Sequence, residues 1–177
     1  MRIYRPTLYV GLGGTGCRVG AELERGLREH FPPDQLPSRV QFLYADLNEN
    51  DLPAAAVRIR LATSFGTCPE VARSLCQGAA QSAVGWLPPP PGEPLIGPLA
   101  LGACQLPAVG RTALFETLRE RPSAVRIPLP SEIVTKSLPC NVFVAFSVAG
   151  GTGGGVFLDF LRLIADAFAL EDLHVRI

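Results

Sequence analysis

Apolar residues group in short runs along the chain, and most of these runs lead into a polar or glycine-rich turn. Thr7–Leu12, Val40–Ala45 and Asn141–Val148 are rich in β-branched and aromatic residues, which predicts buried strands. The last of the three is almost wholly apolar, as expected for a central parallel strand covered on both faces. Val57–Ala62 alternates apolar and polar residues, which predicts a strand whose two arginines point into solvent.

Helical spacing of apolar residues follows several of these strands. It predicts helices over Cys17–Glu29, Pro69–Val84, Arg111–Arg121 and Val156–Leu170, with a further strand at Leu173–Ile177. In the first helix Val19, Leu23 and Leu27 lie four residues apart on one predicted face. The alternation of strands and helices predicts an α/β fold with a doubly wound, mostly parallel sheet. Its helices would cover both faces, and a ligand would bind at the carboxyl ends of the strands.

The pattern weakens between residues 63 and 99. Here the segment 86–98 contains six prolines in eleven residues, which cannot join a helix interior or a sheet ladder. We expect a stiff, extended surface insertion there, with a proline-rich docking site as the alternative. The length of 177 residues fits one domain spanning 1–177.

Composition excludes several classes of protein. The 16 basic and 16 acidic side chains cancel and form no basic stripe, which argues against nucleic-acid binding. No apolar stretch reaches the roughly 18 residues of a membrane span, and no secretory leader is evident, so we expect a cytoplasmic protein. Five cysteines without a CxxC pair, and two histidines that no motif places beside them, give neither a zinc pattern nor a catalytic cysteine.

Glycine carries the strongest chemical signal. Nine of the 18 glycines fall in two windows, 11–16 and 150–155, each between a predicted strand and a predicted helix. Unpaired N–H groups at a helix amino terminus bind anions, and glycine lets phosphate oxygens approach them closely. The only lysine, Lys136, follows no glycine, which excludes a Walker A loop. The two loops therefore predict a phosphate site built from backbone amides.

The first window alone leaves the ligand open. GLGGTG matches the dinucleotide fingerprint GxGxxG, which requires an acidic residue about 20 positions further on to bind ribose. Asp46 lies 30 positions after Gly16, a stretched spacing. A Rossmann-type NAD(P)-binding oxidoreductase module is therefore one hypothesis, although it leaves the second window unexplained.

The second window favours another family. SVAGGTGGG at 147–155 resembles the GGGTGTG or GGGTGSG signature of the tubulin and FtsZ superfamily, and GLGGTGCRV resembles the amino-terminal glycine loop of FtsZ. GACQLPAVGRTA at 102–113 is similar to a third FtsZ loop, GAGxNPxxGRxA. These loops and the acidic turn after the second strand occur in the family's order. The resemblance spans most of the chain and implies the amino-terminal part of a tubulin/FtsZ-like nucleotide-binding domain.

The resemblance also implies residue roles. In the family the first loop and the signature loop wrap the phosphates of GTP or GDP, with Mg²⁺ expected beside them. The residues that this assigns are Gly13, Gly14, Thr15, Gly16, Cys17, Arg18, Asp46, Ala103, Cys104, Gly150, Gly151, Thr152, Gly153 and Gly154. Asp46 would lie near the phosphates and the magnesium-bound water, and Ala103 and Cys104 belong to the loop that senses the γ-phosphate. Arg18 stands where FtsZ has an asparagine that contacts guanine, which leaves the choice of base open.

The departures from FtsZ fit a divergent bacterial tubulin-like branch. The family's later loops are absent, including the one with the acidic residue that polarises the attacking water, so no catalytic or metal-ligating residue is assigned. We expect the chain to be a fragment that binds guanine nucleotide without turnover, while an intact parent would hydrolyse GTP and self-associate into filaments. A tubulin-like scaffold that has lost nucleotide binding is the remaining alternative.

Overall fold

The computed structural model describes residues 3–32, 36–54, 57–61, 67, 70, 73, 99–136 and 138–173. Its elements are β1 (Thr7–Leu12), α1 (Gly13–His30), α2 (Leu36–Arg39), β2 (Val40–Asp46), η1 (Glu49–Asp51), β3 (Val57–Arg60), η3 (Leu99–Leu101), α4 (Pro107–Glu120), η4 (Pro122–Ala124), α5 (Ser131–Lys136), β4 (Asn141–Ala145) and α6 (Gly151–Leu170). The helix predicted after Pro69 and the proline-rich segment 86–98 lie outside the described residues, apart from Glu70 and Arg73. The strand predicted at the end also lies outside them, apart from Leu173.

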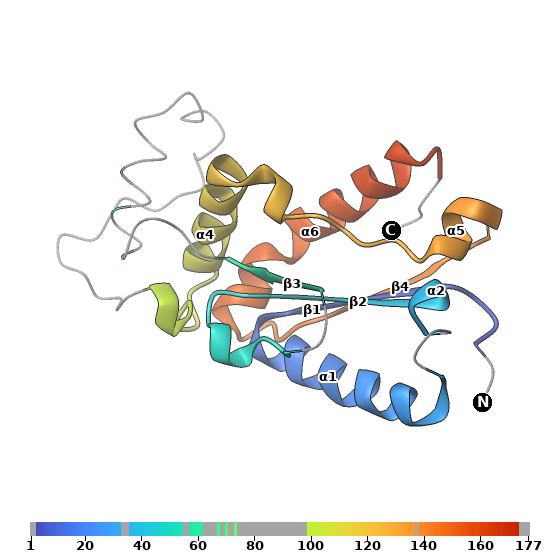
Figure 1. Ribbon diagram of the computed structural model, residues 1–177. Coiled ribbons are helices and arrows are strands. Elements are labelled where there is room, and N and C mark those ends of the chain that lie inside the picture. Colours follow the sequence, from blue (N-terminus) through green and yellow to red (C-terminus); the bar gives the residue numbers. More distant parts are fainter. Residues whose placement is uncertain are drawn as a thin grey trace.

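The four described strands form one parallel sheet in the order β3-β2-β1-β4 (Figure 1). Thr7 at the start of β1 is level with Val40 of β2 on one side and with Asn141 of β4 on the other. All four strands therefore end at the same edge of the sheet, and the predicted doubly wound α/β class is confirmed.

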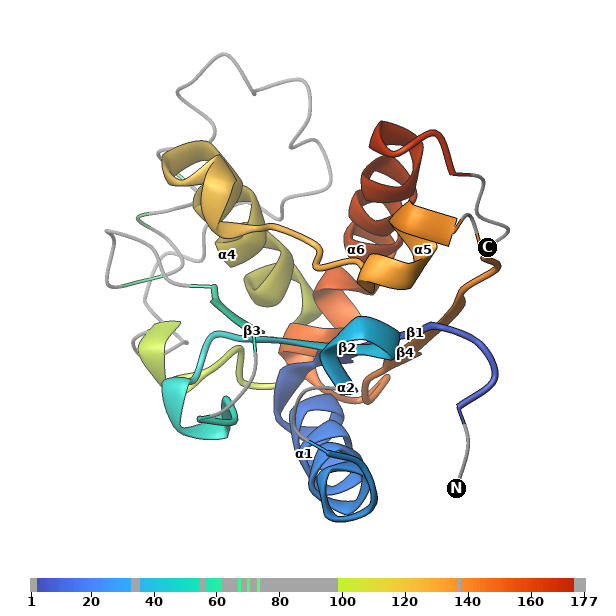
Figure 2. The ribbon, with the colours of Figure 1, turned by 45° about the vertical axis from the view of Figure 1, so that its right-hand side comes forward.

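Helices cover both faces of this sheet, α1 on one face and α4 with α6 on the other (Figure 2). Successive residues of β1 point to opposite faces. Leu8 and Val10 belong to the larger core, which they share with Val109 of α4 and Phe160 of α6, whereas Tyr9 belongs to the smaller core beneath α1. The loop after each strand is thus held between two packed layers.

The face of α1 that packs on the sheet is not the one predicted. Val19 and Leu23 are 54% and 47% exposed, and only Leu27 of the predicted stripe is buried. The buried face contains Gly16 and Gly20 instead, because small residues let the helix lie very close to the strands. A Cβ on Gly16 would stand 2.1 Å from the carbonyl oxygen of Ala145, and one on Gly20 would stand 2.3 Å from the ring of Tyr9.

Among the four described strands, β4 is not central as predicted for 141–148, and the strand predicted at Leu173–Ile177 lies outside the described residues apart from Leu173. β4 ends at Ala145 and lies at the edge, and the central strands are β1 and β2. Phe143 of β4 is 57% exposed as a result. The opposite edge, β3, exposes Arg58 and Arg60 and buries Ile59, which confirms the alternation predicted there.

Three helices begin earlier than the sequence pattern predicted. α1 starts at Gly13, α4 at Pro107 and α6 at Gly151, each four or five residues upstream of the predicted start. Apolar periodicity does not register glycines, so it missed these first turns. Eight of the nine glycines in the two windows therefore lie at a helix amino terminus, and Gly11 belongs to β1.

Candidate functional site

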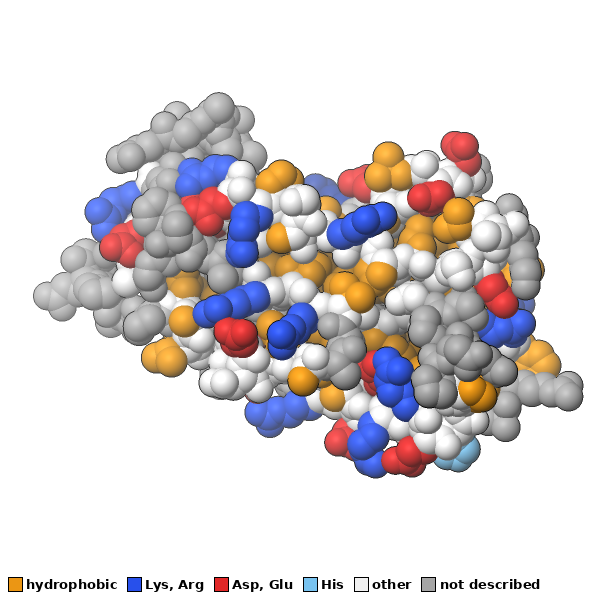
Figure 3. Space-filling view, in the orientation of Figure 1, with side chains coloured by type: hydrophobic (Ala, Val, Ile, Leu, Met, Phe, Trp, Pro, Cys, Tyr) orange, Lys and Arg blue, Asp and Glu red, His pale blue; other side chains and the backbone are white. Residues whose placement is uncertain are grey.

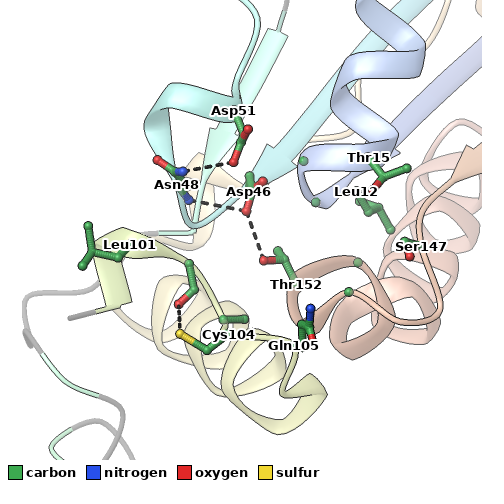
Figure 4. Close-up of a pocket in the computed structure, with 17 residues that line it drawn as sticks. Leu12, Thr15, Asp46, Asn48, Asp51, Leu101, Cys104, Gln105, Ser147 and Thr152 are labelled. Carbon is green, nitrogen blue, oxygen red and sulfur yellow. Dashed lines mark hydrogen bonds between the residues drawn. The ribbon is translucent and has the colours of Figure 1, made fainter. Parts of the chain in front are cut away.

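A cavity of about 170 Å³ lies where the carboxyl ends of β1, β2 and β4 meet the segment before α4 (Figure 4). Its wall comes from the start of α1, the turn after β2, the segment 101–105 and the start of α6. The lining residues are Leu12, Gly13, Gly14, Thr15, Asp46, Asn48, Asp51, Leu101, Gly102, Ala103, Cys104, Gln105, Ser147, Gly150, Gly151, Thr152 and Gly153. The parallel topology thus brings the predicted loops together at one point, as expected for the carboxyl edge of such a sheet.

Two helix amino termini open onto this cavity without a cap. The residues that precede α1 and α6 are Leu12 and Gly150, and neither makes a side-chain capping bond within the described part of the chain. The first turn of each helix also lacks an acidic residue. No side chain of the two preceding residues therefore caps the first N–H groups of either helix, and the two helix dipoles favour a negative charge there.

The two helix starts touch each other. Gly13 has a φ of +70°, in the left-handed region, and a Cβ there would stand 3.0 Å from the backbone nitrogen of Gly153. A Cβ on Gly153 would stand 2.7 Å from the carbonyl oxygen of Leu12. Glycine is required at both positions because the loops after β1 and β4 pack backbone against backbone.

Two other glycines of the cavity wall are not required by packing. A Cβ on Gly14 would meet only the carboxyl group of Asp51, at 3.2 Å or more, and a Cβ on Gly150 would come no closer than 3.4 Å to any atom. Both glycines line the cavity. A pair of tight turns without a ligand would not need glycine at these two positions, so their bare backbone favours a ligand that approaches it.

Asp46, the last residue of β2, ties the turn after that strand to α6. Its Oδ1 accepts hydrogen bonds from the Thr152 hydroxyl at 3.0 Å and from the Asn48 N–H at 3.4 Å (Figure 4). It also accepts one from the Leu47 N–H at 2.7 Å. Burial raises the pKa of Asp46 above its ordinary value, and these three donors oppose that rise only in part. Oδ1 takes all the hydrogen bonds described for this carboxylate.

A second acidic side chain, Asp51 of η1, lines the same wall. Its Oδ2 accepts a hydrogen bond from the Asn48 side-chain amide at 3.0 Å, and its Oδ1 pairs with the Arg18 guanidinium of α1 at 3.1 Å. None of the described residues that line the cavity is basic. Arg18 lies outside the wall and reaches it only through Asp51.

The segment before α4 contains three residues in the left-handed region of φ. Gly102 has a φ of +108°, Cys104 of +48° and Gln105 of +61°. Left-handed backbone at a residue other than glycine costs of order 1–3 kcal/mol, and such residues cluster at ligand-binding sites. Cys104 and Gln105 are exposed and face the cavity, so the strain lies in its wall.

Most of the predicted site residues belong to this wall. Those that line it are Gly13, Gly14, Thr15, Asp46, Ala103, Cys104, Gly150, Gly151, Thr152 and Gly153. The structure places Gly16, Cys17, Arg18 and Gly154 outside it. Cys17 lies on the buried face of α1 and is fully buried. Burial raises the pKa of its thiol to about 12, so its side chain belongs to the core.

Seven wall residues were not predicted from the sequence: Leu12, Asn48, Asp51, Leu101, Gly102, Gln105 and Ser147. Asn48 and Asp51 stand in the polar cluster DLNEND at 46–51, of which the resemblance assigns only Asp46 to the site. A polar cluster directly after a buried parallel strand is a signal for the ligand edge of the sheet, and it could have identified both residues.

Within the described ranges, no three His, Cys, Asp or Glu side chains lie together so as to hold a metal ion. None of the described helices combines the length and the hydropathy that a membrane span needs. Basic and acidic side chains neighbour one another at several places on the face shown in Figure 3.

Comparison with known proteins bears on the family of the chain. No curated protein matched the chain. A family model described as "Tubulin like" matches residues 8–177, which include every element around the cavity. On that match the chain belongs to the tubulin-like family.

Proposed function

We propose that the chain binds the phosphate groups of a guanine nucleotide, GTP or GDP, in the cavity between α1 and α6. The observation that carries this proposal is the convergence of two uncapped helix amino termini on one cavity. Small-molecule sites occupy roughly 300–1,000 Å³, so a cavity of about 170 Å³ takes only part of a nucleotide. The phosphate chain is the part that backbone N–H groups suit, and the guanine base follows from the resemblance to the FtsZ loops.

Magnesium fits this proposal as a partner of the phosphates. The cavity wall offers oxygen donors of the kind that Mg²⁺ prefers: the carboxylates of Asp46 and Asp51 and the hydroxyls of Thr15 and Thr152. Two carboxylates do not hold the ion alone, and Mg²⁺ is commonly held by one or two carboxylates together with substrate phosphates. Mg²⁺ would supply charge neutralisation at the phosphate chain.

The dinucleotide alternative fits the site less well. It requires an acidic residue at the end of the second strand that is free to bind ribose. Asp46 occupies that place, but it is buried and its Oδ1 is bonded to Thr152 of the opposite loop. Hydrolysis and filament formation belong to the proposal for a longer tubulin-like chain, and for residues 1–177 we expect binding without turnover.

The direct test is a thermal-shift titration with GTP, GDP, ATP, NADH and NADPH, each with and without Mg²⁺. At 100 times the dissociation constant a ligand adds about 2.7 kcal/mol of stability, which raises Tm by roughly 5–10 °C in a chain of this size. We expect that shift with GTP and GDP. A shift with a dinucleotide alone would support the Rossmann alternative, and no shift with any of the five would support a scaffold that binds no nucleotide.

The variant Thr152→Val tests whether the cavity is the site. Valine keeps the shape of the side chain but removes the hydroxyl that lines the cavity and donates to Asp46. We expect nucleotide affinity to fall by roughly ten- to a hundredfold, since a hydrogen bond to a charged group contributes about 1.5–3 kcal/mol. Thr152→Ser keeps the hydroxyl and serves as the control. Equal affinities for the wild type and both variants, measured by calorimetry, would place the ligand elsewhere.

A further inference from the structure

The cavity wall presents an electrostatic problem for a phosphate ligand. It contains the carboxylates of Asp46 and Asp51, and none of the described residues that line it is basic. Two negative side chains repel a polyphosphate across a few ångströms. Either a cation accompanies the ligand, or the charge of the wall is reduced by a residue outside it.

The two carboxylates are held by different kinds of donor. Asp46 is 3% exposed and receives its bonds from a hydroxyl and from backbone N–H groups, all of them neutral. Asp51 has a side chain that is 24% exposed, and one of its donors is the charged guanidinium of Arg18. Only Asp51 therefore has its charge balanced by a neighbouring cation among the described contacts.

Arg18 balances the charge of Asp51 from outside the cavity. It lies in the second turn of α1, so the start of the helix lines the cavity while the Arg18 side chain, 80% exposed, reaches across to η1. Among the described ion pairs, the Arg18–Asp51 pair is the one that includes a residue of the cavity wall. An exposed pair of this kind contributes little to folding stability, so its main effect is on the charge of the wall.

We propose that Arg18 is a positioning residue for the phosphate site: by pairing with Asp51 it cancels one of the two negative charges in the wall and so admits the phosphate chain. This inference rests on the proposed function. Since the Asp51 carboxyl lies 3.2–3.4 Å from where a Cβ on Gly14 would stand, its charge acts near the first N–H groups of α1, where the ligand would bind. Arg18 thus sets how strongly affinity depends on the number of phosphates.

The two partners of the pair give opposite predictions. Arg18→Ala leaves Asp51 uncompensated, and we expect it to weaken GTP binding about three- to tenfold, measured without Mg²⁺ at low ionic strength. Asp51→Asn removes the repulsion and should strengthen binding about threefold or more. Both effects should be smaller for GMP, which has one phosphate, and should shrink as salt is added. If the Arg18–Asp51 pair only held η1 in place, both variants would bind GTP more weakly than the wild type.

Two further variants control for folding and for general charge. Arg18→Lys keeps the charge and should bind GTP within about twofold of the wild type. Arg25→Ala removes an arginine of the same helix whose partners, Glu22 and Glu29, are exposed and outside the cavity wall, and it should leave GTP binding unchanged. We expect Tm to change by less than about 4 °C in each, since each affected pair is exposed.

The outcomes separate the two proposals. If the wild type binds GTP and Arg18→Ala binds it equally well, or if Arg18→Ala and Asp51→Asn both weaken binding, the role of Arg18 in wall charge is overturned and the proposed function stands. If the wild type binds none of the nucleotides with or without Mg²⁺, the proposed function falls and the role of Arg18 falls with it. Opposite changes in the two variants, diminishing with salt, support the inference.

Discussion

At the scale of single residues, buried acidic side chains are satisfied to different degrees. Asp46 has three donors on one oxygen, and its position at the end of β2 joins two loops of the site. Glu116 of α4 is fully buried, and its Oε1 accepts a hydrogen bond from Arg119. Its Oε2 has no partner among the described atoms. An unpaired buried carboxylate oxygen destabilises the charged form of the side chain.

We therefore expect Glu116 to make stability depend on pH. Burial raises the pKa of Glu116, the charge and hydrogen bond of Arg119 lower it, and neighbouring Glu120 raises it. The folded-state pKa lies above the unfolded one, so the stabilisation is complete at low pH and is lost as pH rises through the folded pKa. Glu116→Gln should be more stable than the wild type at pH 7 and should lose this dependence.

Urea unfolding at pH 4 and pH 7 measures the effect of Glu116→Gln. The control Glu22→Gln changes an exposed side chain of α1 and should alter the free energy of unfolding by no more than about 0.5 kcal/mol at either pH. If Glu116→Gln and the wild type had the same free energy of unfolding at pH 7, Oε2 would have a hydrogen-bond partner after all.

At the scale of elements, the glycines of α1 separate two functions within one helix. Gly13 and Gly14 belong to the cavity wall, whereas Gly16 and Gly20 let the helix lie close to the sheet. A third kind is Gly26, where a Cβ would meet nothing within 4 Å. Glycine therefore plays a different structural part at different positions along the helix.

This difference predicts opposite effects of one substitution. In Gly16→Ala the new Cβ would stand 2.1 Å from a backbone oxygen of β4, which cannot move aside, and we expect a loss of about 3 kcal/mol of unfolding free energy. In Gly26→Ala the new methyl group is free, and alanine favours the helix by roughly 0.5–1 kcal/mol. Denaturant unfolding of both variants measures the contrast. Equal stabilities would mean that α1 does not pack closely on β4.

The same helix shows which parts of the fold the sequence could predict. The strands and the order of the loops were predictable, because apolar runs and glycine motifs are local. The packing face of α1 was not, because hydropathy rates Val19 and Leu23 above Gly16 and Gly20, although the glycines alone allow close contact. The polar cluster after β2 marks the neighbourhood of Asp51, but its pairing with Arg18 depends on how η1 lies against α1, which no local pattern records.

At the scale of the whole molecule, the two edges of the described sheet are unlike. β3 exposes Arg58 and Arg60, and exposed charges of this kind discourage edge-to-edge pairing. β4 has the sequence NVFVA, without a charge, and exposes Phe143. The sequence shows that this strand is apolar. It does not show which strands lie beside it, because that depends on the topology of the sheet. Of the two edges of the described sheet, the β4 edge is therefore the less protected against pairing with another strand.

The contact between Gly13 and Gly153 has a mechanical consequence. One glycine begins the helix on one face of the sheet, and the other lies in the first turn of a helix on the opposite face, so the two helical layers are joined at this point. A ligand bound there would hold both layers at once, and neither layer could separate from the sheet before the ligand left. Binding energy gained at the joint would then slow global unfolding rather than order a single loop.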